Sequence, residues 1–195
     1  FTKSDMAGDR MAHLHVGDKS LVVRSFVDGG PARSISVGLP GGVNYLFNAE
    51  KCYVEFGWTG MFLDNTPNVG KNENDRGGAW NKILGARFNV GAEGFPLRIG
   101  NSPAAPTVRF RGYRRAEPPQ FLYEVDGVAV RQSIVAVSGQ TLKYDFEIGA
   151  PGQPIQFRVN PAGLALSSTA GEFNGGILTV PTHAQGRFSV TISQR

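Results

Sequence analysis

The chain has 195 residues, of which 41% are hydrophobic and 18% are charged, and its formal net charge is +4. This length and hydrophobic content are enough for one domain with its own core, without help from metals or disulfides. No apolar run approaches the roughly 18 residues that cross a bilayer as a helix, and the composition is too hydrophobic for a disordered chain. The 26 glycines and 12 prolines have no collagen-like period, so they predict many turns and few long helices.

Residues 1–19 are polar and mixed in charge, so we expect an N-terminal arm or linker ahead of the domain. The chain starts at Phe1 without an apolar signal core, which is typical of a processed mature protein or of a piece of a longer one. The only cysteine, Cys52, excludes an internal disulfide, a thioether-linked haem and a cysteine-based zinc site. Its apolar neighbours predict a small buried side chain.

Short β-rich runs separated by turn residues follow this arm. The first four cover residues 21–27, 33–39, 43–47 and 52–58. Glycine, proline and asparagine mark the breaks between them, as in Pro40-Gly41-Gly42. Regular short runs with this punctuation are typical of an all-β sandwich or barrel.

Two irregular stretches interrupt the rhythm. Residues 64–82 are polar and rich in glycine, and a loop of this length inside a compact domain is usually functional or disordered. Residues 91–106 are rich in proline and glycine, which oppose regular strand pairing but suit a crossing between sheets. We expect function to lie in this irregular middle part of the chain.

The β-rich pattern resumes in the second half. The runs cover residues 107–114, 120–125, 128–134, 142–148, 155–159, 176–180 and 187–192. Asp126-Gly127 predicts a two-residue type I′ hairpin, and strict alternation over 142–148 predicts a strand with one face in the core and one in water. We therefore predict an all-β fold, a jelly-roll-like antiparallel β-sandwich with long irregular loops and little helix, formed as a single domain by residues 20–195.

Several segments together resemble a family of bacterial periplasmic domains. These segments are Ser34–Phe47, Trp58–Asp64, Asp75–Gly78, Phe110–Tyr113 and Phe121–Val125. The family is found beside mono-haem cytochrome c domains and sorbosone/glucose-dehydrogenase-like domains in large secreted proteins. The resemblance covers about residues 20–135 and continues less distinctly to the end. It implies an exported location and a redox neighbourhood for a domain that itself binds no haem, and it assigns no catalytic residues.

The long loop gathers side chains that can bind a ligand. They are Asp64, Asn68, Glu73, Asp75, Arg76 and Trp80. This mixture of acids, amides, one arginine and an indole suits a sugar or a Ca²⁺ ion held by oxygen ligands. The alternative is a structural or partner-docking loop, because Asp, Asn and Gly are common in turns and the acids lack the spacing of an EF-hand. In that case a pair between Arg76 and Asp64 would make the loop rigid.

Motifs of several enzyme classes are absent from the sequence, which has no Gly-x-Ser-x-Gly elbow, HExxH, P-loop or dinucleotide fingerprint. Two carboxylates could still act as the acid and base of a glycosidase or lyase, and the candidate acids are Glu55, Asp64, Asp75 and Glu93. His13 and His15 would share one face of an extended strand, as in some metal sites, but exposed histidines are the simpler interpretation. We expect no catalytic residue, no metal and no cofactor.

The densest basic cluster consists of Arg109, Arg111, Arg114 and Arg115, interleaved with Phe110 and Tyr113. On an ordinary half-exposed strand Val108 and Phe110 would be buried, while Arg109 and Arg111 would face water. The modest net charge favours an anionic protein surface or lipid headgroups as the partner, rather than nucleic acid.

The sequence thus favours a non-catalytic accessory or scaffolding subunit, exported to the periplasm or the extracellular space. Its expected partners are the protein subunits of a larger, membrane-associated redox complex of the photosynthetic or respiratory kind, with a membrane surface as a further contact. The alternative is a carbohydrate-binding module or carbohydrate-active enzyme, in which Trp58, Trp80 or Tyr113 stacks on a sugar ring. The candidate contact residues are Asp64, Asn68, Asp75, Arg76, Trp80, Arg109 and Arg111.

Overall fold

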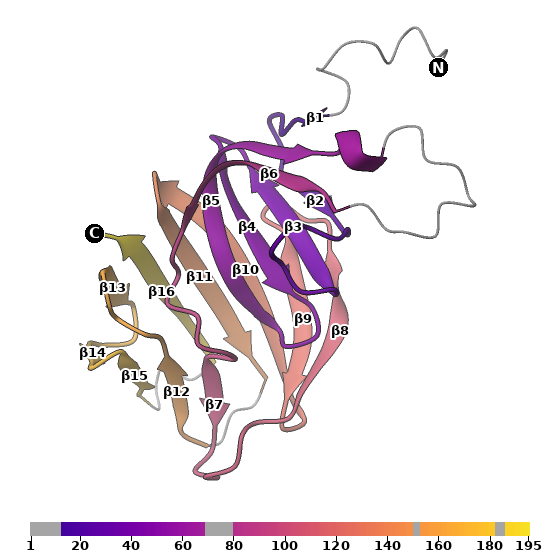
Figure 1. Ribbon diagram of the computed structural model, residues 1–195. Helices are drawn as coiled ribbons and strands as arrows, with labels where there is room; N and C mark the ends of the chain where they lie inside the picture. Colours follow the sequence, from indigo (N-terminus) through magenta and orange to yellow (C-terminus); the bar gives the residue numbers. More distant parts are fainter. Residues whose placement is uncertain (1–12, 69–79, 150–152, 182–185) are drawn as a thin grey trace, which may run out of the picture.

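A computed structural model describes residues 13–68, 80–149, 153–181 and 186–195 (Figure 1). The N-terminal sheet contains β1 (His13–Leu14), β2 (Leu21–Val23), β3 (Ser34–Leu39), β4 (Val43–Asn48), β5 (Tyr53–Asp64) and β6 (Lys82–Phe88). The C-terminal sheet contains β8 (Val108–Arg114), β9 (Gln120–Val125), β10 (Val128–Ser138), β11 (Thr141–Ile148), β13 (Leu164–Ser168) and β16 (Arg187–Gln194). A small sheet contains β7 (Leu97–Ile99), β12 (Ile155–Arg158), β14 (Phe173–Asn174) and β15 (Ile177–Val180). The 3-10 helix η1 (Thr66–Asn68) follows β5.

The two large sheets form the predicted antiparallel β-sandwich. The N-terminal sheet has the order β1-β5-β4-β3-β2, with β6 also paired to β5, and the C-terminal sheet has the order β13-β16-β11-β10-β9-β8. In Figure 1 the N-terminal sheet lies in front of the C-terminal sheet, and the small sheet, of order β14-β15-β12-β7, lies at the lower left. The fold class predicted from the sequence is therefore confirmed.

Local sequence signals are accurate where paired strands follow one another in the chain. Asp126 and Gly127 join β9 to β10 with φ angles of 49° and 82°, as a type I′ turn requires. Along β11 the residues alternate between buried and half-buried, which places Leu142, Tyr144 and Phe146 in the core. The period of two and the turn residues together decide the register of these strands.

The core between the large sheets is rich in aromatic rings. Phe47 of β4 stacks on Phe121 of β9 with ring centroids 3.8 Å apart, and Tyr45 meets Phe121 edge-on at 6.3 Å. All three side chains are fully buried. Burial of a side chain of this size contributes about 1.5–3 kcal/mol. The contact joins the first half of the chain to the second.

The outer face of the N-terminal sheet is covered as well. Residues 13–27, here called the strap, run over this face, and β3 and β4 are buried along their whole length. Val16 of the strap packs so closely on Gly38 that a Cβ at Gly38 would overlap it. A second apolar cluster forms on this side around Trp58 and Phe62.

The strap contains the end of the predicted arm. His13–Leu14 forms β1 and pairs with β5, and Val16 packs on the outer cluster, so the predicted boundary at residue 19 falls inside the strap. Residues 1–12 lie outside the described residues. Within the described part of the chain, no helix is long and apolar enough to cross a membrane.

Several strand predictions differ from the structure. The run 21–27 is a strand only to Val23, whereas β5 extends as far as Asp64. β7 lies inside 91–106, where we expected no regular pairing, because three residues between proline-rich turns are enough to pair with β12. The sequence did not predict β6 or β13, which contain glycine, alanine and serine and pair with strands that are strongly β-forming.

Candidate functional site

A groove lies beside the start of the long loop, where three segments meet. One segment is the strap after β2, the second precedes β3, and the third includes η1. The groove has a volume of about 500 Å³ and is lined by Arg24, Ser25, Phe26, Ala32, Arg33, Ser34, Asn65 and Asn68. We call it the Arg24–Asn68 groove. Its volume is in the range of sites that bind small molecules or a few side chains of a partner.

A buried asparagine holds the groove together. Asn81 is 1% exposed, and its Nδ2 donates to Ser25 Oγ at 2.8 Å while its Oδ1 accepts from Asn68 Nδ2 at 2.6 Å. Its backbone N–H donates to the Phe26 carbonyl, and its own carbonyl accepts from the Asp28 N–H, both at 2.9 Å. Asn81 therefore links the strap, η1 and the start of β6, and these contacts fix the groove geometry before any ligand binds.

Two large aromatic side chains are exposed at the groove. Phe26 lines it, and Trp80 contacts Phe26 with ring centroids 5.2 Å apart and planes tilted by 56°. Each side chain is 44% exposed. Their neighbours Val27 and Asn81 form an isolated parallel bridge, so the backbone beneath both rings is fixed. Aromatic rings that are exposed yet held in place are typical of binding surfaces, because ordering them costs little further entropy.

The charges that line the groove are positive. Arg24 and Arg33 are exposed, and neither forms an ion pair with a carboxylate among the described residues. The acid nearest in sequence to Asn65 is Asp64, which accepts hydrogen bonds from the Thr66 hydroxyl and, at 2.8 Å, from the Thr66 N–H. These bonds, with a smaller contribution from His13 at 3.9 Å, lower the pKa of Asp64. The Asp64 carboxylate is thus engaged in its own turn.

The structure brings together part of the predicted loop site. Asn68 and Trp80 both contact the network around Asn81 and Phe26, while Asp64 lies at the end of β5. Glu73, Asp75 and Arg76 lie outside the described residues, so the predicted Arg76–Asp64 pair stays a prediction.

Trp58, a candidate for stacking on a sugar, is fully buried in the outer cluster, and its indole Nε1 donates to the Phe62 carbonyl at 3.0 Å. That candidate is therefore wrong, because a ring enclosed on both faces cannot meet a ligand. Tyr113 of β8 is half-buried and packs against the main core. Trp80 is the one of the three that lies exposed beside the groove.

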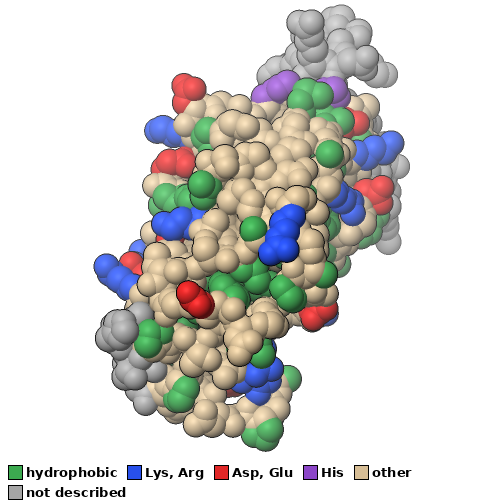
Figure 2. All heavy atoms as spheres, turned by 90° about the vertical axis from the view of Figure 1, so that its left-hand side faces the viewer, with side chains coloured by type: hydrophobic (Ala, Val, Ile, Leu, Met, Phe, Trp, Pro, Cys, Tyr) green, Lys and Arg blue, Asp and Glu red, His purple; other side chains and the backbone are tan. Residues whose placement is uncertain are grey.

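The predicted arginines of β8 lie on another surface. Arg111 Nη2 is 2.8 Å from Glu124 Oε2, and this hydrogen bond lowers the pKa of Glu124. Arg109 is the cross-strand partner of Glu124 in the β8–β9 register. The outer face of the C-terminal sheet continues with Arg131–Glu147, also at 2.8 Å. Positive and negative side chains are also interspersed on the side of the molecule shown in Figure 2. These arginines belong to a mixed ionic surface rather than to a basic patch.

The carboxylates considered for acid–base chemistry are held in separate local networks. Glu55 Oε1 accepts from Asn48 Nδ2 at 2.6 Å, and Glu93 Oε1 accepts from Asn160 Nδ2 at 2.7 Å. Asp64 is held by Thr66, as described above. A glycosidase needs two carboxylates facing each other across the scissile bond. Each of these three described acids instead accepts a hydrogen bond from a different neighbour: Glu55 from β4, Asp64 from its own turn and Glu93 from the segment after β12.

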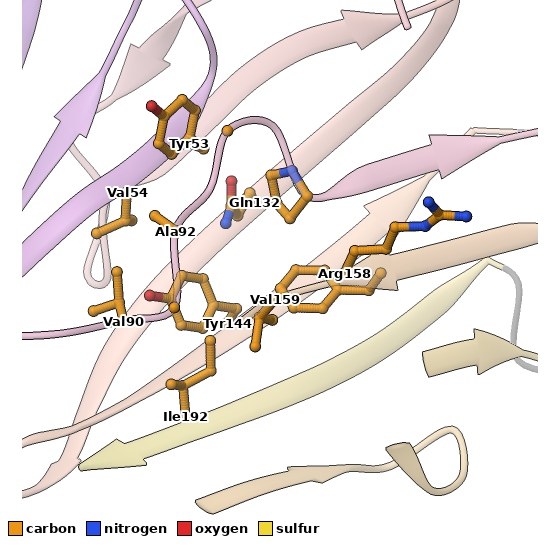
Figure 3. A pocket seen from close by; sticks show the side chains of 13 residues that line it. Tyr53, Val54, Val90, Ala92, Gln132, Tyr144, Arg158, Val159 and Ile192 are labelled. Carbon is orange, nitrogen blue, oxygen red and sulfur yellow. The ribbon is translucent and has the colours of Figure 1, made fainter. Parts of the chain in front are cut away.

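A small cavity between β5, residues 90–96, β12 and the inner face of the C-terminal sheet is lined mainly by apolar side chains, with a few polar groups among them (Figure 3). Gln132 is 2% exposed there, and its Oε1 accepts from Tyr123 Oη at 3.0 Å. Burial raises the pKa of Tyr144 well above its usual range and that of Tyr53 to about 12, so both phenols stay protonated. The cavity has a volume of about 20 Å³, which is enough for one buried water and too small for a sugar ring.

Cys52 and the histidines give no further site. Cys52 is 1% exposed, as predicted, and burial raises the pKa of its thiol to about 12, which disfavours the reactive thiolate. The rings of His13 and His15 lie 6.5 Å apart at the start of the strap. Within the described residues, no group of three or more His, Cys, Asp or Glu side chains is placed to hold a metal ion.

Sequence reasoning missed most of the groove, namely Arg24, Phe26, Arg33, Asn65 and Asn81. Arg24 and Phe26 lie within the run 21–27, which has the pattern of an ordinary strand. Asn81 lies in the predicted loop, where asparagine is common and indicates no particular contact. Alternation from the buried Val22 predicts a buried Phe26. In the structure β2 ends at Val23, so the alternation stops before Phe26 and this side chain is exposed. Only tertiary contacts, such as the bridge between residues 27 and 81 and the bonds of Asn81 to Ser25 and Asn68, show that these segments meet.

No protein-family model matches the chain, and no curated protein matches it significantly in sequence. Among solved structures, the crystal structure of YidC from Thermotoga maritima aligns with 91% of this chain and 51% of that chain. The alignment has a TM-score of 0.46 and 17% sequence identity. The chain thus spans about half the length of that structure.

Proposed function

We propose that this protein is a non-catalytic accessory subunit that docks, in the periplasm or outside the cell, on a larger membrane-associated redox assembly of the photosynthetic or respiratory kind. The resemblance of segments in residues 20–135 to a cytochrome-associated periplasmic module supports the location and the kind of host. The chain itself would contribute a binding surface and no cofactor.

The observation that carries the docking role is the exposed pair Phe26–Trp80 beside the Arg24–Asn68 groove. Arginine and large aromatic side chains are the residues that most often dominate the binding energy of protein interfaces. Asn81 holds the strap and η1 in place, so a partner would meet a surface that is already formed.

The state of the carboxylates supports a role without catalysis. Glu55 accepts a hydrogen bond from the paired strand β4, Asp64 accepts from its own turn, and Glu93 accepts from Asn160 in the segment after β12. A general acid must instead face the substrate with its pKa tuned toward neutrality. The pKa of Asp64 is instead lowered by its hydrogen bonds with Thr66, which favours the ionised carboxylate in a structural role.

Purification from native membranes tests the proposal. The full chain, carrying an affinity tag, should copurify under mild detergent with subunits that contain haem or another redox cofactor, detected by absorbance spectroscopy and mass spectrometry. Phe26→Ala/Trp80→Ala should reduce this recovery severalfold, because two large contact side chains are lost. Val137→Ala, which truncates a 58% exposed side chain at the end of β10, is the control and should leave recovery unchanged. Wild-type protein that elutes alone would contradict the proposal.

Carbohydrate binding is the second candidate, since the groove combines aromatic rings with the side-chain amides of Asn65 and Asn68. Sugar sites commonly pair a ring that stacks on the sugar with polar groups that bind its hydroxyls. Glycan-array binding by the wild-type chain that is lost in Trp80→Ala, with no copurifying subunits, would favour this candidate over docking.

A further inference from the structure

We infer that the Arg24–Asn68 groove binds an acidic, extended peptide segment of the partner. This inference rests on the proposed docking function and adds the chemistry of the segment that docks. Three features of the groove point to it: two arginines without an ion-pair partner among the described residues, the side-chain amides of Asn65 and Asn68, and a tilted aromatic pair.

The charge of the groove selects a negative ligand. Among the described residues, the two ionic side chains that line it are Arg24 and Arg33, from the strap and from the segment before β3, and no described acid lines it. Neither arginine forms an ion pair within the described part of the chain, in contrast to Arg111 and Arg131, which contact Glu124 and Glu147. Aspartate or glutamate carboxylates of a partner would supply the missing counter-charge through charge-assisted hydrogen bonds.

The amide groups of the groove match a peptide backbone. Asn68 uses its Nδ2 in bonds to Asn65 Oδ1 at 2.8 Å and to Asn81 Oδ1 at 2.6 Å. Within the described part of the chain, these bonds leave Asn68 Oδ1 as an acceptor and Asn65 Nδ2 as a donor. An extended peptide offers an N–H and a carbonyl at each residue, which complement such a donor and acceptor pair.

The aromatic pair favours a peptide over a sugar. A sugar ring stacks its flat face on one exposed planar ring, but Phe26 and Trp80 are tilted by 56° and contact each other at 5.2 Å. Two tilted rings form an angled surface that suits a prolyl or aliphatic side chain. The expected segment therefore has acidic residues beside a proline or leucine.

A titration with defined probes tests the groove directly. The probe is the peptide acetyl-Gly-Asp-Pro-Leu-Glu-Gly-amide, and its control is the same peptide with Asn and Gln in place of Asp and Glu. In ¹H–¹⁵N spectra of the full chain, the acidic peptide should shift the Trp80 indole signal and the side-chain amide signals of Asn65 and Asn68. The neutral peptide should bind about tenfold more weakly or worse.

Variants with equal changes in charge locate the site. Arg24→Glu/Arg33→Glu should weaken binding of the acidic peptide by about tenfold or more, whereas Arg109→Glu/Arg114→Glu on β8 should change it less than about twofold. Equal binding of both peptides, equal loss in both double variants, or no shift at Trp80 would overturn the inference. Tri-galacturonate that shifts the same signals at lower concentration than the peptide would also overturn it, in favour of an acidic sugar.

Copurification separates this inference from the proposed function. If wild type captures the cofactor-bearing subunits and Arg24→Glu/Arg33→Glu does not, both stand. If the double variant captures them as well as wild type does, the docking function stands and the groove is not where the partner binds. If wild type captures none, the docking function fails, and the peptide titration alone decides what class of ligand the groove accepts.

Discussion

The two faces of the N-terminal sheet are both buried, but by different chemistry. The inner face contributes Val37, Tyr45 and Phe47 to the main core, where the rings of Tyr45 and Phe47 meet Phe121 of the C-terminal sheet. The outer face combines small and polar residues with the second apolar cluster: Ser34, Ser36, Gly38 and Asn44 are buried there beside Leu46, Trp58 and Phe62.

This difference separates the contacts that supply most of the stability from those that form the proposed binding groove. Sheet-on-sheet contact buries the larger cluster and gives the domain its free energy of folding. Contact with the strap buries less apolar surface, but it brings Arg24 and Phe26 beside Asn65 and Asn68. Substitutions on the inner face should therefore unfold the protein, whereas those on the outer face should first alter the groove.

The largest effect is expected from Phe121→Ala. Loss of a ring that is fully buried and stacked on Phe47 should lower the free energy of unfolding by about 3–5 kcal/mol, measured by guanidinium titration. Leu122→Ala, the next residue on β9 and half-buried on the opposite face, should cost about 1 kcal/mol or less. Equal losses of unfolding free energy in the two variants would show that the inner face contributes no more to stability than the outer face.

Gly38→Ala should disturb the outer face by crowding. Its Cβ would overlap Val16 Cγ2 and lie 3.0 Å from Phe62 Cδ2, so the strap must shift at a cost of about 1–3 kcal/mol. Val16→Ala in the same chain should restore most of this stability, because it removes the overlapping methyl group. Gly17→Ala, where nothing lies within 4 Å of a new Cβ, is the matched control. Failure of the double variant to recover would refute close packing of the strap.

Asn81→Ala should loosen the groove more than the fold. The substitution removes the side-chain bonds to Ser25 and Asn68 and should cost about 1–2 kcal/mol in chemical denaturation. Amide hydrogen exchange at Asp28, whose N–H donates to the Asn81 carbonyl, should speed up while that of β11 stays slow. Asn101→Ala, at an exposed turn, should change neither measurement. Uniform acceleration across the domain would mean that the strap and the sandwich unfold together.

The smallest effect concerns the link between the strap and the β8–β9 loop. Ser20 donates its N–H and its hydroxyl to Glu117 at 2.8 and 2.5 Å, and these bonds lower the Glu117 pKa below its ordinary value of 4.5. Because the pKa is lower in the folded state, this stabilisation is present above about pH 4.5 and is lost as pH falls through the folded pKa.

Glu117→Gln tests this link through its difference from wild type in the free energy of unfolding. Since the carboxylate is exposed, the difference should be less than about 1 kcal/mol at neutral pH and should vanish in acid. Ser20→Ala removes the same bonds and should give the same pH profile. A difference that grows as the solution is acidified would contradict the assignment.

Some features of the fold and site could be predicted from local patterns. Asp126-Gly127 and the alternation along β11 determine their structures within a few residues, because turn conformation and strand face depend on neighbours in the chain. Asn68 and Trp80 belong to a loop whose composition suggested binding. Arg24 and Phe26 could not be found in this way, since the groove depends on Asn65, Asn68 and Trp80, which lie far along the chain from both residues.

The sequence by itself determined the fold class, because period-two hydrophobicity and frequent glycine and proline turns leave an antiparallel β-sandwich as the way to bury these side chains. The tertiary structure decided which tryptophan is exposed: bonds to residues 61 and 62 hold Trp58 inside, while Trp80 lies outside against Phe26. It also decided that the strap and the long loop form one groove. That arrangement depends on a single buried asparagine and one bridge between residues 27 and 81, contacts that no local pattern encodes.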